Sequence, residues 1–225
     1  MAKPIADIVS KMNLHRALSD IAEIRAQLDR TETYRGFRSA TVGVSVVFLV
    51  IGAWVQSWWI TKIEVQIDRY LTIWFWVAFL SAACVVIEML IRSRISGNRL
   101  VAKMHWSLLR HITPCLLVGI VLTFLIEQNY RETLIVDGPP STGGLIWALP
   151  GLWSMIYSLG LLHCRRDLPV QTLGVAFYFL MSGLMLLVRN WEAREVDGMH
   201  MLATFGVGQT LLAIVLFWNL ERRRG

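Results

Sequence analysis

Two polar side chains that could take part in chemistry, Glu88 and Gln209, lie inside long apolar stretches of the chain. A carboxylate in such a stretch is a functional candidate by default, for example as a proton carrier. Arg92 follows Glu88 by four residues on the same helical face, so an interfacial Glu88–Arg92 pair is the simpler explanation. Gln209 lies near the middle of its stretch and must face a partner. That partner is either a ligand or, more commonly, a neighbouring helix.

A proline interrupts another apolar stretch, residues 143–160, which reads GGLIWALPGLWSMIYSLG. On a helix that runs through this stretch, Pro150 leaves the carbonyl oxygen of Ile146 without its usual donor. The resulting kink either lines a cavity, as in discontinuous transporter helices, or is tolerated by the helices around it. We therefore keep Pro150 as a cavity candidate beside Glu88 and Gln209.

Small residues recur at helical spacing in this stretch and again near the end of the chain. Such stripes let neighbouring helices approach closely inside a membrane, where apolar side chains gain little by leaving lipid. We expect the two stripes to form the central packing pair of the protein. Their small members are Gly144, Ala148, Gly151 and Ser158 in the first stripe, and Ala203, Gly206 and Thr210 in the second.

The sequence contains ten tryptophans, and most of them fall in one half of the apolar stretches. Aromatic belts at the membrane surface explain most of this pattern. A second interpretation is an outward-facing cavity lined by indoles, which would suit an apolar or quaternary ammonium ligand, with Trp147 as a candidate.

Histidines and cysteines do not converge on a site. His105, His111, His163 and Cys164 lie near one end of their apolar stretches, and the chain has no HxxxH, CxxC or HExxH spacing. Metal or haem ligation needs convergent donors. We therefore predict no metal, no cofactor and no catalytic residue.

The elements that must position these residues are membrane helices. Of the 225 residues, 55% are hydrophobic and 17% charged, whereas a soluble domain carries about 25% charged residues. Six stretches have the length of about 20 residues that crosses a hydrocarbon core, and backbone groups in lipid must be paired within a helix. We predict an all-α, polytopic six-helix membrane domain over residues 40–225. Its spans are Ala40–Ile60, Tyr70–Ile91, Leu108–Gln128, Gly143–His163, Val170–Asn190 and His200–Asn219.

Basic residues set the expected orientation. All but five of the 22 lysines and arginines fall on the side that holds the N-terminus, which the positive-inside rule places in the cytoplasm together with the C-terminus. The exceptions are Lys62, Arg69, Arg131, Arg189 and Arg194. The net charge of +6 thus reflects topology and attraction to the lipid bilayer, and we expect no nucleic-acid partner.

Two segments on the cytoplasmic side could bind a protein partner. Residues 1–39 include an amphipathic helix, Leu14–Leu28, which either docks a partner or packs beneath the bundle. The Arg92–Arg110 segment is expected to be a basic loop with a short helix, Leu100–Trp106. It either docks a cytoplasmic protein such as an ATPase or orients the chain by meeting anionic lipid.

Three short motifs resemble a family of bacterial six-helix inner-membrane proteins that has no assigned activity. They are LIWALPGLW (Leu145–Trp153), LHCRRDLP (Leu162–Pro169) and FGVGQ (Phe205–Gln209), with a looser likeness at Tyr34–Gly36. The resemblance implies a bacterial inner-membrane location and supplies no site. In organisation alone, a cytoplasmic helix followed by six spans is similar to export-type ABC permease subunits.

Three classes of function follow from these observations. The first is a membrane binding or interaction protein, an accessory subunit or a sensor of an apolar ligand. The second is a small permease or ABC-type membrane subunit, which requires Glu88, Pro150 and Gln209 to line one cavity. The third, a membrane enzyme, has no supporting motif.

Overall fold

The computed structural model describes residues 39–60, 67–96, 99–137, 145–165, 168–193 and 197–221, and every regular element in these ranges is helical. The chain divides into two compact units, Met1–Arg35 and Gly36–Gly225, and all described residues belong to the second. The predicted helix Leu14–Leu28 lies outside them. In chain order the elements are α2 (Ser39–Trp59), α3 (Ile67–Ser96), α4 (Arg99–Asp137), η2 (Ile146–Ala148), α5 (Leu149–His163), α6 (Thr172–Ala193), α7 (Gly198–Met201), η3 (Leu202–Gly206), α8 (Val207–Leu216) and η4 (Phe217–Glu221).

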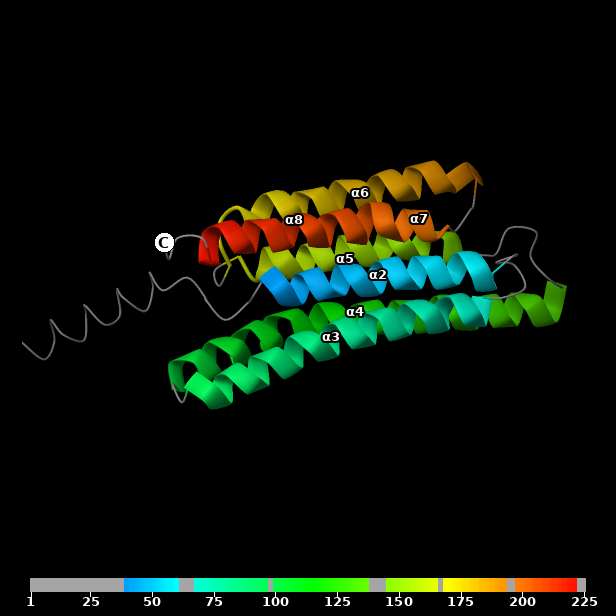
Figure 1. Ribbon diagram of the computed structural model, residues 1–225. Helices are drawn as coiled ribbons and strands as arrows, with labels where there is room; N and C mark the ends of the chain where they lie inside the picture. Colours follow the sequence, from blue (N-terminus) through cyan, green and yellow to red (C-terminus); the bar gives the residue numbers. More distant parts are fainter. Residues whose placement is uncertain are drawn as a thin grey trace, which may run out of the picture. The chain divides into compact units, whose positions relative to one another are not determined.

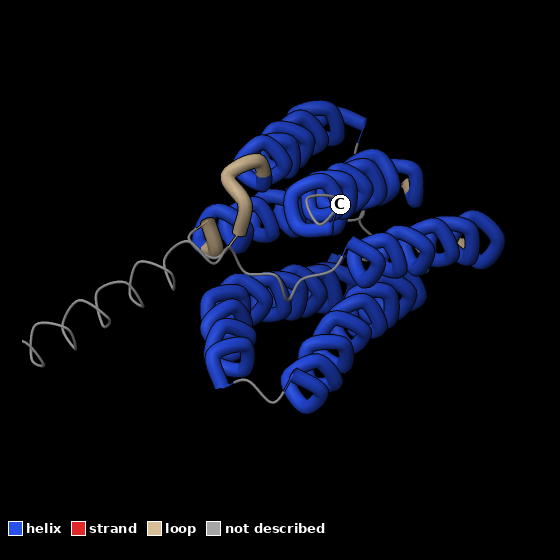
Figure 2. Tube along the Cα trace, turned by 60° about the vertical axis from the view of Figure 1, so that its left-hand side comes forward, coloured by secondary structure: helices blue, strands red, loops and turns tan. Residues whose placement is uncertain are grey.

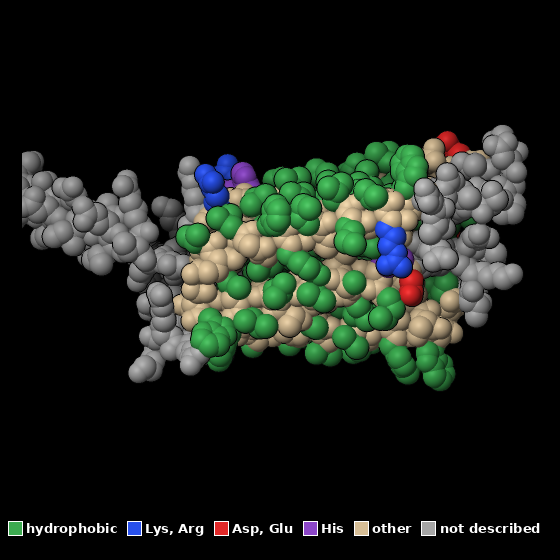
Figure 3. All heavy atoms as spheres, turned by 90° about the horizontal axis from the view of Figure 1, so that it is seen from above, with side chains coloured by type: hydrophobic (Ala, Val, Ile, Leu, Met, Phe, Trp, Pro, Cys, Tyr) green, Lys and Arg blue, Asp and Glu red, His purple; other side chains and the backbone are tan. Residues whose placement is uncertain are grey.

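Five helical stretches among the described residues are long and apolar enough to cross a membrane. They confirm that the described part of the chain is helical and has several membrane-length helices. Their bounds are Ser39–Trp59, Ile67–Ile91, Leu109–Glu132, Thr172–Trp191 and Gly198–Asn219. The last one runs through α7, η3 and α8 into η4 without a break in the helical path. On the face seen in Figure 3, hydrophobic side chains cover the middle and charged ones lie near the two ends.

The predicted fourth span is divided, and the expected kink at Pro150 is wrong. A short 3-10 helix, η2, precedes α5, and Pro150 lies in the first turn of α5. A proline is favourable there because its missing N–H has no intrahelical acceptor to lose. The carbonyl oxygen of Ile146 accepts the backbone N–H of Leu149, so it is not left without a donor. With 15 residues, α5 is about 22 Å long, shorter than a hydrocarbon core of about 30 Å.

The predicted loop Arg92–Arg110 is also wrong, because most of it is helical. Helix α3 continues to Ser96 and α4 begins at Arg99. The two helices therefore form a long hairpin, which extends past the apolar part of both. At the opposite end of this hairpin, Arg131 forms ion pairs of 2.8 Å with Asp68 of α3 and with Glu127 of α4.

Helices α5 and α6 form the closest pair in the bundle. Helix α2 packs against α3 on one side and α8 on the other, and α4 packs against α5. The central pair is thus α5 with α6, not the predicted pairing of the fourth span with the last. Figures 1 and 2 show that α3 and α4 diverge from the other helices toward the end at which α3 passes into α4.

Small residues explain the close approach of α5 and α6. A Cβ atom built on Gly151 would lie 2.8 Å from the carbonyl oxygen of Gly183, and one on Gly183 would lie 2.7 Å from that of Gly151. Two fully buried hydroxyls cross the same interface: Ser154 donates to the carbonyl of Phe179 at 2.7 Å, and Ser158 to that of Ala176 at 2.6 Å. Small residues permit backbones at this distance, and the two serines also pair their hydroxyls with carbonyls of the facing helix.

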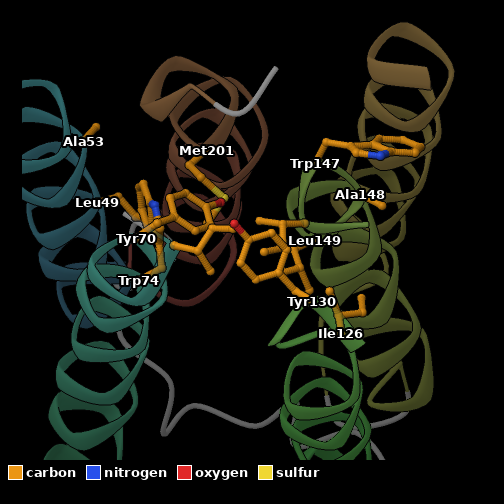
Figure 4. Close-up of a cluster of buried hydrophobic side chains, with 12 residues drawn as sticks. Leu49, Ala53, Tyr70, Trp74, Ile126, Tyr130, Trp147, Ala148, Leu149 and Met201 are labelled. Atoms are coloured by element: carbon orange, nitrogen blue, oxygen red, sulfur yellow. The ribbon is translucent and has the colours of Figure 1, made fainter. Parts of the chain in front are cut away.

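A cluster of buried side chains joins the diverging hairpin to the other helices at the opposite end (Figure 4). Trp74 of α3 donates its indole N–H to the amide oxygen of Gln56 on α2 at 2.8 Å. In Figure 4, Tyr70 of α3 and Tyr130 of α4 point toward each other between the two groups of helices, and Met201 lies beside them. This cluster therefore closes the bundle at one end, while only the far end of the hairpin, where α4 begins, stands apart at the other.

Candidate functional site

The polar pair Gln209–Tyr157 lies at mid-depth in the membrane-length part of the protein. The side-chain amide of Gln209 on α8 donates to the hydroxyl of Tyr157 on α5 at 2.9 Å. The helix-to-helix bond expected for Gln209 is thus confirmed. The main neighbours of α5 are α6 and α4, and the main neighbour of α8 is α2. Two long side chains therefore bridge helices that are not close neighbours.

Two further aromatic rings, those of Phe179 and Phe205, pack with the ring of Tyr157 in this pair. The ring of Tyr157 lies 4.8 Å from that of Phe179 on α6 and 5.9 Å from that of Phe205 on η3, centre to centre, and Phe179 and Phe205 are 5.6 Å apart. The rings are tilted or edge-to-face, which is favourable for aromatic groups. Gly208 makes room for Phe179, because a Cβ atom there would lie 2.3 Å from the ring. These five residues are called the aromatic site below: Tyr157, Phe179, Phe205, Gly208 and Gln209.

A π-helical segment, η3, positions Phe205 at the aromatic site. At the end of η3 the backbone N–H of Val207 bonds to the carbonyl oxygens of Leu202 and Thr204. It does not bond to the carbonyl oxygen of Ala203, which an α-helix would use. The hydroxyl of Tyr178 on α6 donates to the Ala203 carbonyl. Wide helical turns of this kind are frequent at functional sites. Here the side chain of a neighbouring helix satisfies the carbonyl that the wide turn leaves over.

The other predicted candidates are spread over the molecule. Glu88 is half-buried on α3, and the side chain of Arg92 lies outside the described residues. Trp147 is buried, with its ring 5.8 Å from that of Trp191, and Pro150 is buried at the start of α5. Glu88, Pro150 and Gln209 thus belong to α3, the first turn of α5 and α8 respectively.

The small residues predicted to pack between helices differ in burial. Ala148, Gly151, Ser158 and Gly206 are buried, whereas Ala203 and Thr210 are exposed. The Thr210 hydroxyl donates within its own helix, to the carbonyl of Gly206. Gly144 lies outside the described residues.

The inward face of α3 changes character along its length. Tyr70 and Trp74 are buried near the start of α3, whereas Ser81, Cys84 and Glu88, at the same helical azimuth, are only half-buried. Residues at a spacing of three and four share a helix face. The change from buried to half-buried follows the divergence of the hairpin seen in Figure 1.

Near the hairpin end of α4 and α5, His111 and His163 lie with ring centres 5.0 Å apart. The sulfur of Cys115 on α4 comes within 3.7 Å of a Cβ atom built on Gly160. Within the described ranges no three acidic, histidine or cysteine side chains could hold one metal ion. The histidines therefore serve as a contact between α4 and α5 in this structure.

Sequence reasoning missed most of the aromatic site. Helical spacing puts Tyr157 on a face that points away from the stripe of small residues, and phenylalanines are ordinary members of apolar helices. The detectable signal was Gln209 alone, since a polar residue in mid-membrane needs a partner. Which residue would serve depended on the π-helical segment, for which the sequence carries no recognised pattern.

Comparison of the chain with protein-family models, curated proteins and solved structures finds no match. The function must therefore be argued from the geometry of the chain itself.

Proposed function

We propose that the protein is an integral protein of the bacterial inner membrane, with six crossings and both termini in the cytoplasm, that acts by binding. Its role in this proposal is that of an accessory subunit that docks a cytoplasmic protein. Besides the five membrane-length stretches, η2 and α5 together supply the remaining crossing, which is the fourth in chain order. The 3-10 turn of three residues adds about 6 Å to the length of α5. The basic residues of the sequence support the orientation.

One observation carries the docking role: the α3–α4 hairpin extends beyond its apolar spans. Helix α4 begins at Arg99, ten residues before its span begins at Leu109, which is about 15 Å along the helix axis. The headgroup layer is only about 5–7 Å thick on each side of the hydrocarbon. A helix near the membrane normal therefore carries Arg99 beyond the lipid headgroups and into water.

Trp106 supports this depth. It is 73% exposed and stands three residues before Leu109, about 4–5 Å outside the span, in the layer that indole prefers. Lys103 and Arg99, six and ten residues before Leu109, then lie farther out, where anionic lipid offers them little. A basic tip in water fits an acidic surface on a cytoplasmic protein, because charge complementarity steers association.

The test compares the wild-type protein with the double variant Arg99→Glu, Lys103→Glu. Purification in mild detergent should yield a stoichiometric cytoplasmic partner with the wild type, and the variant should lose it. Arg165→Glu, an exposed arginine after α5, is the matched control and should retain it. If the tip variant loses bound anionic phospholipid and no protein, measured by mass spectrometry, the tip is a lipid-binding element and the docking role is wrong.

A small permease is the second candidate, because the inward face of α3 is half-buried at Ser81, Cys84 and Glu88 and closed off at the other end by the buried cluster around Tyr70. A variant that keeps Cys84 as its sole cysteine allows a direct test with a membrane-impermeant thiol reagent. Labelling from the cytoplasmic side favours a water-accessible path. Resistance in every condition excludes this version of the permease.

A further inference from the structure

We infer that the aromatic site binds a lipophilic carbonyl compound, with Tyr157 and Gln209 holding its oxygen and the rings of Phe205 and Tyr157 its apolar body. This inference deepens the proposed function, since it rests on the view that the protein acts by binding, and it names the ligand class. It uses residues that the docking hairpin does not share.

The first step is the hydrogen-bonding capacity of the pair. In the bond described above, the hydroxyl oxygen of Tyr157 accepts from Gln209, and the phenolic proton has no acceptor among the residues that the structure describes. If the amide is turned over, Tyr157 donates to Gln209, and the N–H groups of the amide turn away from Tyr157. In either orientation the pair holds at least one donor for a further partner.

The second step is depth. Gln209 lies in the middle of the span Gly198–Asn219, about 15 Å from either end. Phospholipid headgroups lie about 15 Å from the membrane centre and do not reach it. An unpaired donor in hydrocarbon is costly. A carbonyl oxygen on an apolar body that is itself dissolved in the hydrocarbon can supply the acceptor at this depth.

The third step is access and shape. Tyr157, Phe205 and Gln209 are all partly exposed, whereas Phe179 behind them is fully buried. The site thus leaves part of the two rings and of the amide uncovered, with the buried ring of Phe179 packed against those of Tyr157 and Phe205. Planar aromatic ketones match both features, because rings pack well against tyrosine and phenylalanine.

The experiment uses benzophenone as a photoreactive probe of the purified full-length protein, with labelled peptides mapped by mass spectrometry. Labelling is expected on α5, η3 and α8. Fluorenone, a planar diaryl ketone, should compete with benzophenone, and fluorene, which has the same rings without the oxygen, should compete about 3- to 10-fold more weakly, the worth of one hydrogen bond. This comparison needs no variant and so does not depend on how a mutant folds.

Two variants sharpen the test. Gln209→Leu combined with Tyr157→Phe should reduce the preference for fluorenone over fluorene to none. Thr113→Val, which removes an exposed hydroxyl that bonds within α4, is the control and should leave the preference unchanged. The inference is wrong if fluorene and fluorenone compete equally well with benzophenone for the wild-type protein, or if the labelled peptides lie outside the aromatic site. The Gln209–Tyr157 pair is then only a bond between helices. Retention of partner binding through the hairpin would then leave the proposed function standing.

Discussion

The helix pairs α5–α6 and α3–α4 are built from similarly apolar sequences, but the first pair is closely packed and the second is largely exposed. In the apolar window of α6, 33% of the residues are buried, against 6% in that of α4. The α5–α6 pair brings two glycines and two serines to one interface, and its backbones nearly touch. Helix α4 also has a glycine, Gly119, but nothing lies within 4 Å of a Cβ built there. In the α5–α6 pair the backbones come this close because both helices carry a glycine at the same depth.

This comparison predicts where stability resides, and the largest effect is expected at Gly151. In Gly151→Ala, the new methyl group would lie 2.8 Å from the backbone oxygen of Gly183, which cannot move without shifting α6. We expect a loss of about 1–3 kcal/mol in the free energy of unfolding, typical of overpacking. Thermal unfolding in detergent measures it.

Gly174→Ala is the matched control, since Gly174 lies on α6 with nothing within 4 Å of its Cβ position. This substitution should leave stability unchanged or raise it by up to about 1 kcal/mol, because alanine favours the helix. Equal losses for both variants would mean that the close contact of α5 and α6 is not the cause.

A smaller effect is expected where α2 meets α3. Gln56→Leu leaves the indole N–H of Trp74 without its acceptor in the buried cluster. An unpaired buried donor costs about 1–2 kcal/mol in unfolding free energy. Ser57→Ala removes an exposed hydroxyl on the same helix and should change the unfolding temperature little. A neutral Gln56→Leu would indicate that Trp74 finds another acceptor.

The contrast between the two pairs also shows what sequence reasoning can reach. Helix class and most span bounds follow from apolar length, and Gln209 follows from the need to pair a polar group in lipid. The partners do not follow, because Gly183 and Tyr157 are chosen by how helices rotate and slide against each other. Pro150 shows the same limit: proline fits both a kink and a helix start, and only the η2 turn before it decides.

The hydroxyls of the α5–α6 interface should matter less than its glycines. Ser154→Ala removes the bond to the Phe179 carbonyl. Interhelical hydrogen bonds of this kind are worth about 0.6 kcal/mol on average. Ser182→Ala, which removes a longer bond of 3.3 Å to the same carbonyl within α6, should cost less. If Ser182→Ala proves the more harmful, the serine on α6 rather than the interhelical bond satisfies this carbonyl.

The smallest effect is expected on the exposed face of α4, at Leu117, which is 55% exposed. Lipid chains are as apolar as leucine, so Leu117→Ala exchanges one apolar contact for another and should change the free energy of unfolding by less than about 0.5 kcal/mol. The measurement is again thermal unfolding, made in detergent and in reconstituted bilayers. A loss above about 1 kcal/mol in bilayers alone would mean that a protein surface, and not lipid, covers this face of α4. The difference between the two helix pairs would then reflect a missing neighbour and not looser packing.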